Sequence, residues 1–319
     1  MKYRKLGASG LEVSEISLGS WLTVGGSLED AKSAELIHKA YALGINFFDT
    51  ANGYNGGRAE ELLGSELQRY DRRRLVVGTK VYWDIEGGPN FFGLSRKHIF
   101  ESCEASLSRL QMDYVDLLQC HRYDEGTPLV ETLRALDDLQ AGGKILYAGV
   151  SCWSAEQISQ AAQIAKKQGF RPLISDQPCY NLLNRGDELA VQPACEAAGL
   201  GWVIFSPLAQ GVLTGKYASK KIPKGSRASD KKRNEWLMPM LTPRILAAVE
   251  AMRKIAKAKK LTPGQLALAW TLSNKLVASA IVGASSAAQL EENAAASGVA
   301  LDAKTLAELE GLFPAAGLG

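Results

Sequence analysis

The sequence predicts an α/β fold, a (β/α)8 or TIM barrel, formed by residues 1–319 as a single domain. Short runs rich in Val, Ile, Leu and Phe alternate with amphipathic segments along the whole chain. The runs are apolar throughout, which is typical of strands buried on both faces of a parallel sheet. A chain of 319 residues also has an ordinary length for one barrel with one core.

The first segment, YRKLGASGLEVSEI, is predicted to form a small hairpin that turns around Gly7 to Gly10. We expect this hairpin to plug the amino-terminal end of the barrel. Eight apolar runs follow and are predicted to be strands, at residues 16–20, 45–50, 75–80, 115–121, 145–151, 173–177, 201–207 and 279–285. Helical spacing predicts helices between them, at 29–43, 58–69, 95–110, 128–141, 154–168 and 187–198, with a helical pair at 243–274.

Composition and charge exclude several classes of protein. Hydrophobic residues make up 46% of the chain and charged residues 22%, values of a globular protein. The 37 basic and 34 acidic residues nearly balance, so no nucleic-acid partner is expected. The five cysteines contain no CxxC pair, which argues against a disulfide framework and a metal site. With neither an apolar leader nor a membrane-spanning run, we expect a cytoplasmic protein without membrane insertion.

Polar side chains end the predicted strands one after another. In chain order they are Asp49, Lys80, His121, Ser151, Gln177, Ser206 and the turn Gly283 to Ser286. In a barrel the carboxyl ends of all strands meet at one face, where active sites are built. We therefore expect these residues to share a site.

Each of these residues also has a simpler interpretation. Asp49 could cap a helix, Lys80 could be a solvated strand end, and His121 could be a structural buried histidine. Together with Tyr54, however, they make a consistent acid–base set. The Lys80 cation would lower the pKa of Tyr54, Asp49 would keep Lys80 charged, and a neutral His121 would orient a carbonyl oxygen.

The motifs around these residues resemble those of the aldo-keto reductase superfamily along essentially the whole chain. They are FDTANGY (48–54), GRAEELLG (57–64), GVS (149–151), QPCYN (177–181), FSPLAQGVLTGKY (205–217) and GASSAAQLEEN (283–293). SRKHI (95–99) and SRAS (226–229) are most similar to the branch of voltage-gated potassium channel β subunits and their bacterial relatives. The resemblance implies catalytic roles for Asp49, Tyr54, Lys80 and His121 in carbonyl reduction.

The resemblance also implies a nicotinamide cofactor held by the barrel, because no GxGxxG motif is present. Ser20 and Trp21 would border the cofactor, Ser151 and Gln177 would hold its carboxamide, and Tyr180 would stack beneath its ring. NADP(H) is expected rather than NAD(H), although Gln289 stands where many members of the family have arginine. The remaining expected contacts are Asp49, Cys152, Phe205, Ser206, Pro207, Leu208, Gln210, Gly211, Lys216, Arg227, Gly283, Ser285, Glu292 and Asn293.

Two segments could bind phosphate groups. The turn at 283–286 leads into a helix start, which favours anions, although ordinary serine caps would look the same. The long connection 208–242 could be disordered, but the resemblance assigns phosphate contacts to Lys216 and Arg227. We expect it to close over the cofactor as a clasp. Cys152 departs from the channel branch, which has arginine there, so one contact is expected to be missing.

Aromatic residues just beyond strand ends predict an apolar pocket for a small-molecule aldehyde or ketone around Tyr54 and His121. They are Trp21, Tyr82, Trp83, Phe91, Phe92 and Trp153. Two other functions fit the same fold. One is a Schiff-base lyase that uses Lys80, and the other is a cofactor-binding redox sensor like the channel subunits, which assemble as tetramers. Assembly of several copies of this chain into a homo-oligomer is therefore a further alternative.

Overall fold

The computed structural model describes residues 1–217, 222–223, 226–231 and 234–315. Within this part of the chain, parallel strands close into a barrel in the order β10-β3-β4-β5-β6-β7-β8-β9. This confirms the predicted (β/α)8 barrel. The strands are β3 (Ile16–Gly19), β4 (Phe47–Asp49), β5 (Val76–Val81), β6 (Val115–Cys120), β7 (Ile145–Val150), β8 (Ser175–Asp176), β9 (Gly201–Ile204) and β10 (Val277–Val282).

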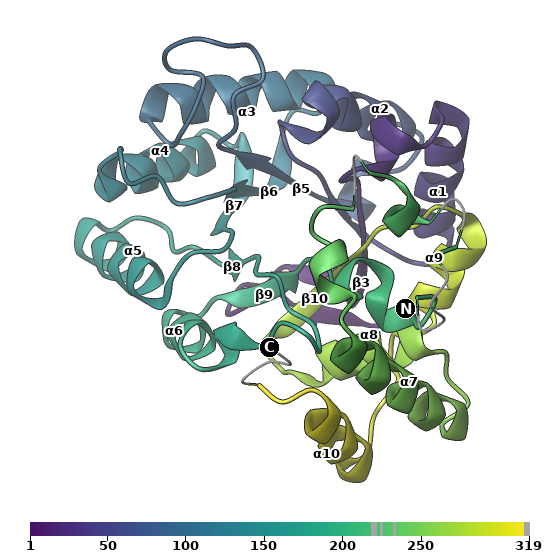
Figure 1. Ribbon diagram of the computed structural model, residues 1–319. Helices are drawn as coiled ribbons and strands as arrows, with labels where there is room; N and C mark the ends of the chain where they lie inside the picture. Colours follow the sequence, from purple (N-terminus) through teal and green to yellow (C-terminus); the bar gives the residue numbers. More distant parts are fainter. Residues whose placement is uncertain (218–221, 224–225, 232–233, 316–319) are drawn as a thin grey trace.

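Helices surround this barrel (Figure 1). They are α1 (Asp30–Ala42), α2 (Arg58–Leu67), α3 (Arg96–Leu110), α4 (Leu129–Ala141), α5 (Ala155–Gln168), α6 (Val191–Ala198), α7 (Pro243–Ala258), α8 (Pro263–Ser273), α9 (Ala287–Ala294) and α10 (Ala303–Leu312). Their starts follow from local sequence: Ser154 and Gln157, for example, form a capping box at the start of α5. The sequence prediction had no helix at α10, which packs against α7.

The predicted hairpin plug is also present. Strands β1 (Tyr3–Lys5) and β2 (Glu12–Ser14) pair antiparallel. Leu6 and Val13 are fully buried and pack inside the barrel against residues that begin its strands, among them Phe47, Val76, Ile174 and Ala278. The hairpin therefore closes the amino-terminal end of the barrel and leaves the carboxyl ends of the strands for the site.

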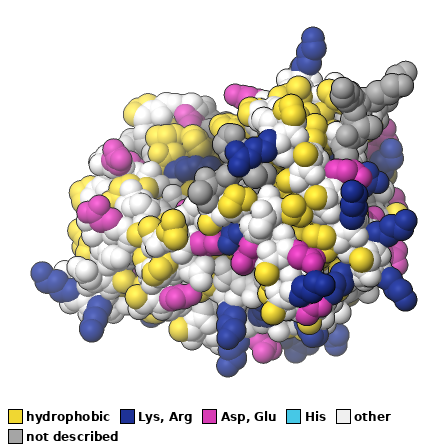
Figure 2. Space-filling view, turned by 60° about the horizontal axis from the view of Figure 1, so that its bottom comes forward, with side chains coloured by type: hydrophobic (Ala, Val, Ile, Leu, Met, Phe, Trp, Pro, Cys, Tyr) yellow, Lys and Arg dark blue, Asp and Glu magenta, His cyan; other side chains and the backbone are white. Residues whose placement is uncertain are grey.

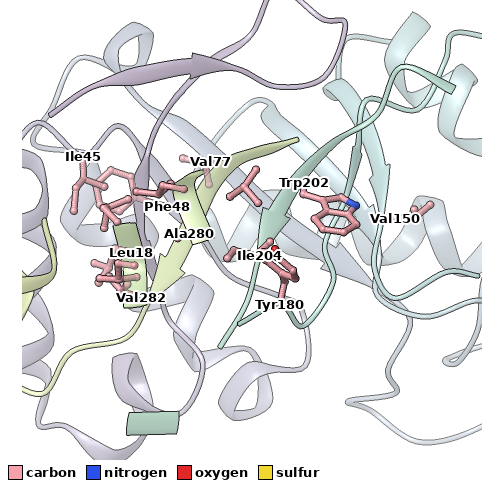
Figure 3. Packing of buried hydrophobic residues seen from close by; sticks show 14 of the residues in the cluster. Leu18, Ile45, Phe48, Val77, Val150, Tyr180, Trp202, Ile204, Ala280 and Val282 are labelled. Atoms are coloured by element: carbon pink, nitrogen blue, oxygen red, sulfur yellow. The ribbon is translucent and has the colours of Figure 1, made fainter. Parts of the chain in front are cut away.

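A second and larger apolar core lies between the strands and the helices. Every residue of β5, β6 and β10 is buried, as expected for strands covered on both faces. Figure 3 shows part of this core, where Phe48, Trp202 and Val282 belong to one cluster of buried residues. The two cores fix the strand ends rigidly, which a site built from several strands requires.

The surface carries charges of both signs. Figure 2 shows one face, on which Lys and Arg side chains are interspersed with Asp and Glu side chains. This mixture matches the near balance of 37 basic and 34 acidic residues. Among the described residues, no helix combines the length and apolar character that crossing a membrane requires.

The packing of α2 on α3 gives a test of the fold, because α2 follows directly after the Tyr54 turn. A Cβ atom on Gly64 would overlap the backbone carbonyl of Leu110, whereas one on Gly311 in α10 would meet open space. We expect Gly64→Ala to lower the free energy of unfolding by about 1–3 kcal/mol, since two backbones must separate. The matched control Gly311→Ala should raise it by up to about 1 kcal/mol, because alanine is the better helix former.

Chemical denaturation of both variants beside the unmodified protein measures these changes. Equal stability of the Gly64 and Gly311 variants would contradict the close approach of α2 and α3.

Candidate active site

The amino group of Lys80 is the centre of the site. Lys80 lies on β5, is fully buried, and donates hydrogen bonds to Asp49 Oδ1 at 2.6 Å, to the Thr50 carbonyl oxygen at 2.8 Å and to the Tyr54 hydroxyl at 3.3 Å. An ammonium group has three N–H donors, so all three are used. The interpretation of Lys80 as a solvated strand end is therefore wrong.

Asp49 ends β4, and its hydrogen bonds connect it to three other strands or to the residues that follow them. Its Oδ1 accepts from Lys80 on β5, and its Oδ2 accepts from the Gln177 side-chain amide, 2.9 Å away, just after β8. The backbone oxygen of Asp49 also accepts from the Ser20 N–H that follows β3. Both carboxylate oxygens are thus engaged, and Asp49 does not cap a helix.

Burial and charge act in opposite directions on the pKa of each partner. For Lys80, burial lowers the pKa, but the Asp49 carboxylate and Tyr54 raise it more, so the amine stays charged. For Tyr54, burial raises the pKa above its usual value of 10.0, and the opposing charge of Lys80 does not overcome it. Lys80 thus acts in the predicted direction, toward a lower pKa, but in the protein alone the effect of burial is larger.

His121 follows β6 and faces Tyr54. Its imidazole ring lies edge-on to the Tyr54 ring, with centroids 5.6 Å apart, and is 8% exposed. Burial, followed by the charges of Lys80 and Arg122, lowers the pKa of His121 to about 2, so the ring is neutral. Its Nδ1 has no hydrogen-bond partner within the described part of the chain. This nitrogen is itself buried, and the ring as a whole lies against Tyr54.

Exposed aromatic rings flank this pair. Trp83 is 40% exposed and packs edge-on against His121 and Tyr82, and Phe92, 51% exposed, contacts both Trp83 and Tyr82. Trp153 is placed differently from the expectation, because it is 2% exposed and packs edge-on against Tyr123 in the core. The structure thus brings Tyr82, Trp83 and Phe92 together beside His121 and leaves Trp153 out of this wall.

Ser151 and Gln177, the two residues expected at the cofactor carboxamide, lie together, with Cys152 beside them. The Ser151 hydroxyl donates to the Gln177 backbone oxygen over 2.9 Å, and the Cys152 sulfur lies 3.6 Å from the same oxygen. Cys152 has a φ of 56°, a left-handed conformation that is uncommon for a residue with a side chain. Such conformations concentrate at ligand-binding turns.

The structure does not support the expected role of Tyr180. Its ring is stacked on Trp270 and tilted against Trp202, and the residue is 2% exposed, so neither face is open to a cofactor (Figure 3). Phe205 lies one residue after β9 and packs with Val203 in the cluster inside the barrel. It is only partly buried, so it offers an aromatic face at the open end of the barrel.

The backbone after β9 forms a concave turn. Ala209, Gln210 and Gly211 have φ values of 46°, 55° and 94°. The Lys216 ammonium lies so close to Gly211 that a Cβ there would be 2.7 Å from it. Successive backbone amides in such conformations, with a lysine beside them, favour anions. Ser206, Pro207 and Leu208, which are expected cofactor contacts, lead into this turn.

The long connection crosses back to the start of the barrel. The Arg227 guanidinium lies over the Trp21 ring, 5.0 Å from its centroid, although Trp21 follows β3 and Arg227 follows β9. This contact matches a clasp across the barrel mouth. Residues 218–221, 224–225 and 232–233 of the proposed clasp lie outside the described residues.

The remaining expected contacts lie after β10. Ser285 donates to the Gln289 side-chain oxygen through its backbone N–H at 2.8 Å, and Ser286 caps α9. Asn293 is 4% exposed, and its side-chain nitrogen lacks a partner within the described residues. Gly283 and Glu292 belong to the same turn and helix. Buried polar atoms without partners, here and at Gln210 and Ser20, suit residues that hold a polar ligand.

Sequence reasoning missed three polar residues at the site. Asn52 is buried and donates to the Trp83 carbonyl oxygen at 3.1 Å, which joins the Tyr54 turn to the aromatic wall. Asp176 is fully buried beside Gln177, and burial raises its pKa to about 8. Arg122 follows His121 directly. The polar Asp176 within an apolar run was a usable signal, whereas nothing in the sequence singled out Arg122.

No group of three or more metal-binding side chains occurs among the described residues. The chain instead carries a neutral tyrosine and a neutral histidine beside a buried ion pair. This arrangement can donate a proton to an oxygen atom and hold that atom in place.

Comparisons with known proteins identify the family of this chain. The model of the aldo/keto reductase family matches residues 15–313. A rice (Oryza sativa) protein called "Probable voltage-gated potassium channel subunit beta" is 42% identical over 296 residues, which cover 92% of this chain and 90% of that protein. A fission yeast (Schizosaccharomyces pombe) protein called "Putative voltage-gated potassium channel subunit beta" is 42% identical over 299 residues, or 91% and 86% of the two chains. The chain therefore belongs to the aldo/keto reductase family of oxidoreductases.

Proposed function

We propose that the protein reduces aldehydes or ketones to alcohols with NADP(H), and that Tyr54 is the general acid. One observation carries this proposal: the Lys80 ammonium, with all three donors engaged, holds the Tyr54 hydroxyl at 3.3 Å, and the neutral His121 ring lies edge-on to the Tyr54 ring. When bound, the cofactor supplies the hydride. The chain must then supply a proton and orient the carbonyl oxygen.

Tyr54 and His121 divide these tasks. Because burial raises the pKa of Tyr54, its hydroxyl carries a proton throughout the physiological range. Lys80 donates to that hydroxyl and would stabilise negative charge as the proton leaves. A neutral His121 has one N–H to offer to the substrate oxygen. In sum, the carbonyl compound, NADPH and one proton give the alcohol and NADP⁺.

The cofactor would lie across the carboxyl ends of the strands. Ser151 and Gln177 suit its carboxamide, Phe205 suits one face of its ring, and the turn at Gly211 with Lys216 suits its pyrophosphate. Ser285, Gln289 and Asn293 suit the adenosine end. We propose NADP(H) over NAD(H) from the family, although Gln289 cannot form an ion pair with a 2′-phosphate.

Two alternatives compete with this function. A Schiff-base lyase needs a neutral, accessible amine, but Lys80 is fully buried and paired with Asp49, which raises its pKa. The names of the relatives favour the second alternative, a cofactor-binding redox sensor that associates with other subunits. Cofactor that stays bound through purification without turnover would support the sensor.

Replacement of Tyr54 by phenylalanine tests the proton donor. We expect Tyr54→Phe to lower kcat for reduction of an aromatic aldehyde by about 10²–10⁴-fold, since only the hydroxyl is lost. Loss of NADPH absorbance measures turnover, and fluorescence titration should show an unchanged NADPH Kd. Unmodified protein should also prefer NADPH to NADH. Full activity of the phenylalanine variant would refute the role of Tyr54.

The pH dependence follows from the two pKa directions. Reduction needs protonated Tyr54 and neutral His121. The pKa of Tyr54 lies above 10.0, and that of His121 is about 2. We therefore expect kcat/KM for reduction to stay level from about pH 6 to about pH 10 and to fall only above that. A midpoint near neutral pH that is absent from a Tyr54→Phe profile would contradict this assignment.

Arg227 tests the clasp. We expect Arg227→Ala to speed NADPH release roughly tenfold, because a charged contact to phosphate is lost. Stopped-flow fluorescence measures the release rate. Arg134→Ala is the matched control, since Arg134 lies over the Phe170 ring in a similar contact on α4. Equal release rates in both variants would show that the connection does not retain the cofactor.

A further inference from the structure

Arg122 is an arginine with unused hydrogen-bond donors beside the proposed reaction centre. It is half-buried, and its Nη1 donates to the His121 backbone oxygen at 2.6 Å. Within the described residues, Arg122 has no ion pair and no other hydrogen-bond acceptor. A guanidinium has five N–H donors, so most remain for a ligand. No Arg122 atom is among the buried side-chain atoms that lack a partner, so its unused N–H groups reach solvent, where a ligand can contact them.

The charge of Arg122 extends across the pocket. Burial has the largest effect on the pKa of Tyr54, Tyr82, His121 and Cys152, and the positive charge of Arg122 lowers the pKa of all four. These residues follow or end β4, β5, β6 and β7. The hydrogen bond from Nη1 to the His121 backbone oxygen places the guanidinium at the end of β6, beside the residue whose ring faces Tyr54.

Nearby acids form no ion pair with Arg122 within the described residues. The Asp49 carboxylate is committed to Lys80 and Gln177. Asp124, two residues after Arg122, accepts from the Leu94 and Gly126 N–H groups and from the Thr127 hydroxyl. The described residues thus place Arg122 at the edge of the pocket without a direct ion-pair partner, while the Asp124 carboxylate nearby is held by backbone and hydroxyl groups.

The walls next to this cation are apolar. Trp83 packs edge-on against His121, and Phe92 contacts Trp83 and is 51% exposed. A ligand that suits both features combines an apolar or aromatic body with an anionic group. The planar guanidinium matches the two oxygens of a carboxylate in particular.

We propose that Arg122 binds a carboxylate of the substrate, so that the preferred substrates are aldehydes or ketones that also carry a carboxylate group. This inference rests on the proposed carbonyl reduction and narrows its substrate class. The carboxylate takes no part in the chemistry. Hydride adds to the carbonyl carbon, the Tyr54 proton goes to the oxygen, and the product is a hydroxy acid.

Matched substrates and variants test the proposal. The probes are the 2-, 3- and 4-isomers of carboxybenzaldehyde, each beside its neutral methyl ester. For at least one isomer, we expect Arg122→Gln to lower kcat/KM about tenfold more for the acid than for the ester. Arg122→Lys keeps the charge and should retain most of the preference for the acid. The isomer with the largest preference for the acid over the ester shows how far the guanidinium lies from the carbonyl group.

Two results would overturn the proposal. Equal losses on acid and ester would mean that Arg122 only supports the His121 backbone. A weaker NADPH Kd in Arg122→Gln, with the acid preference unchanged, would mean that Arg122 binds the cofactor.

A binding measurement separates this proposal from the proposed function. If no probe is reduced, calorimetric titration of the protein–NADP⁺ complex with carboxybenzyl alcohol and its methyl ester replaces the assay. Tighter binding of the acid that is lost in Arg122→Gln would support the carboxylate site while carbonyl reduction fails. Similar binding of acid and ester would refute the site itself.

Discussion

The site depends on one buried ion pair, that of Lys80 with Asp49. Removing two charges from water costs several kcal/mol per ion, and a buried pair persists only where its remaining hydrogen bonds are made. Here Lys80 also bonds Thr50 and Tyr54, and Asp49 also bonds Gln177. The barrel supplies these partners because β4, β5 and β8 end at the same face. The pair therefore fixes the position of the Tyr54 hydroxyl relative to the ends of these three strands.

The same pair sets the charge of its neighbours. Burial keeps Tyr54 protonated, and the net effect of burial, Lys80 and Arg122 keeps His121 neutral. Two neutral donors thus stand beside a cation that is already paired, an arrangement suited to an oxygen that gains negative charge. Lys80 is paired with Asp49, whereas Arg122 has no ion-pair partner among the described residues. Lys80 and Arg122 both lower the pKa of His121, and Arg122 is also the residue that the proposed carboxylate would contact.

Much of this could be predicted from sequence. The eight apolar runs marked the strands, and the polar residues that end them, Asp49, Lys80 and His121, do meet. The errors have physical causes. Tyr180 lies beyond the two-residue strand β8, where alternation no longer fixes direction, and its ring turned outward onto Trp270. Trp153 lies three residues after β7, in the turn before α5, and its ring is buried against Tyr123. The pKa of Tyr54 depends on its burial, which no sequence pattern reports.

Transfer of deuterium from C4 of labelled NADPH tests the central claim most directly. Mass spectrometry of the alcohol formed from an aromatic aldehyde reports whether the label reaches the carbonyl carbon. The account predicts transfer by the unmodified protein and a large loss of transfer in Lys80→Met, in which Tyr54 loses the cation that stabilises its deprotonated form. Tight NADPH binding without any transfer in the unmodified protein, or undiminished transfer in Lys80→Met, would contradict it.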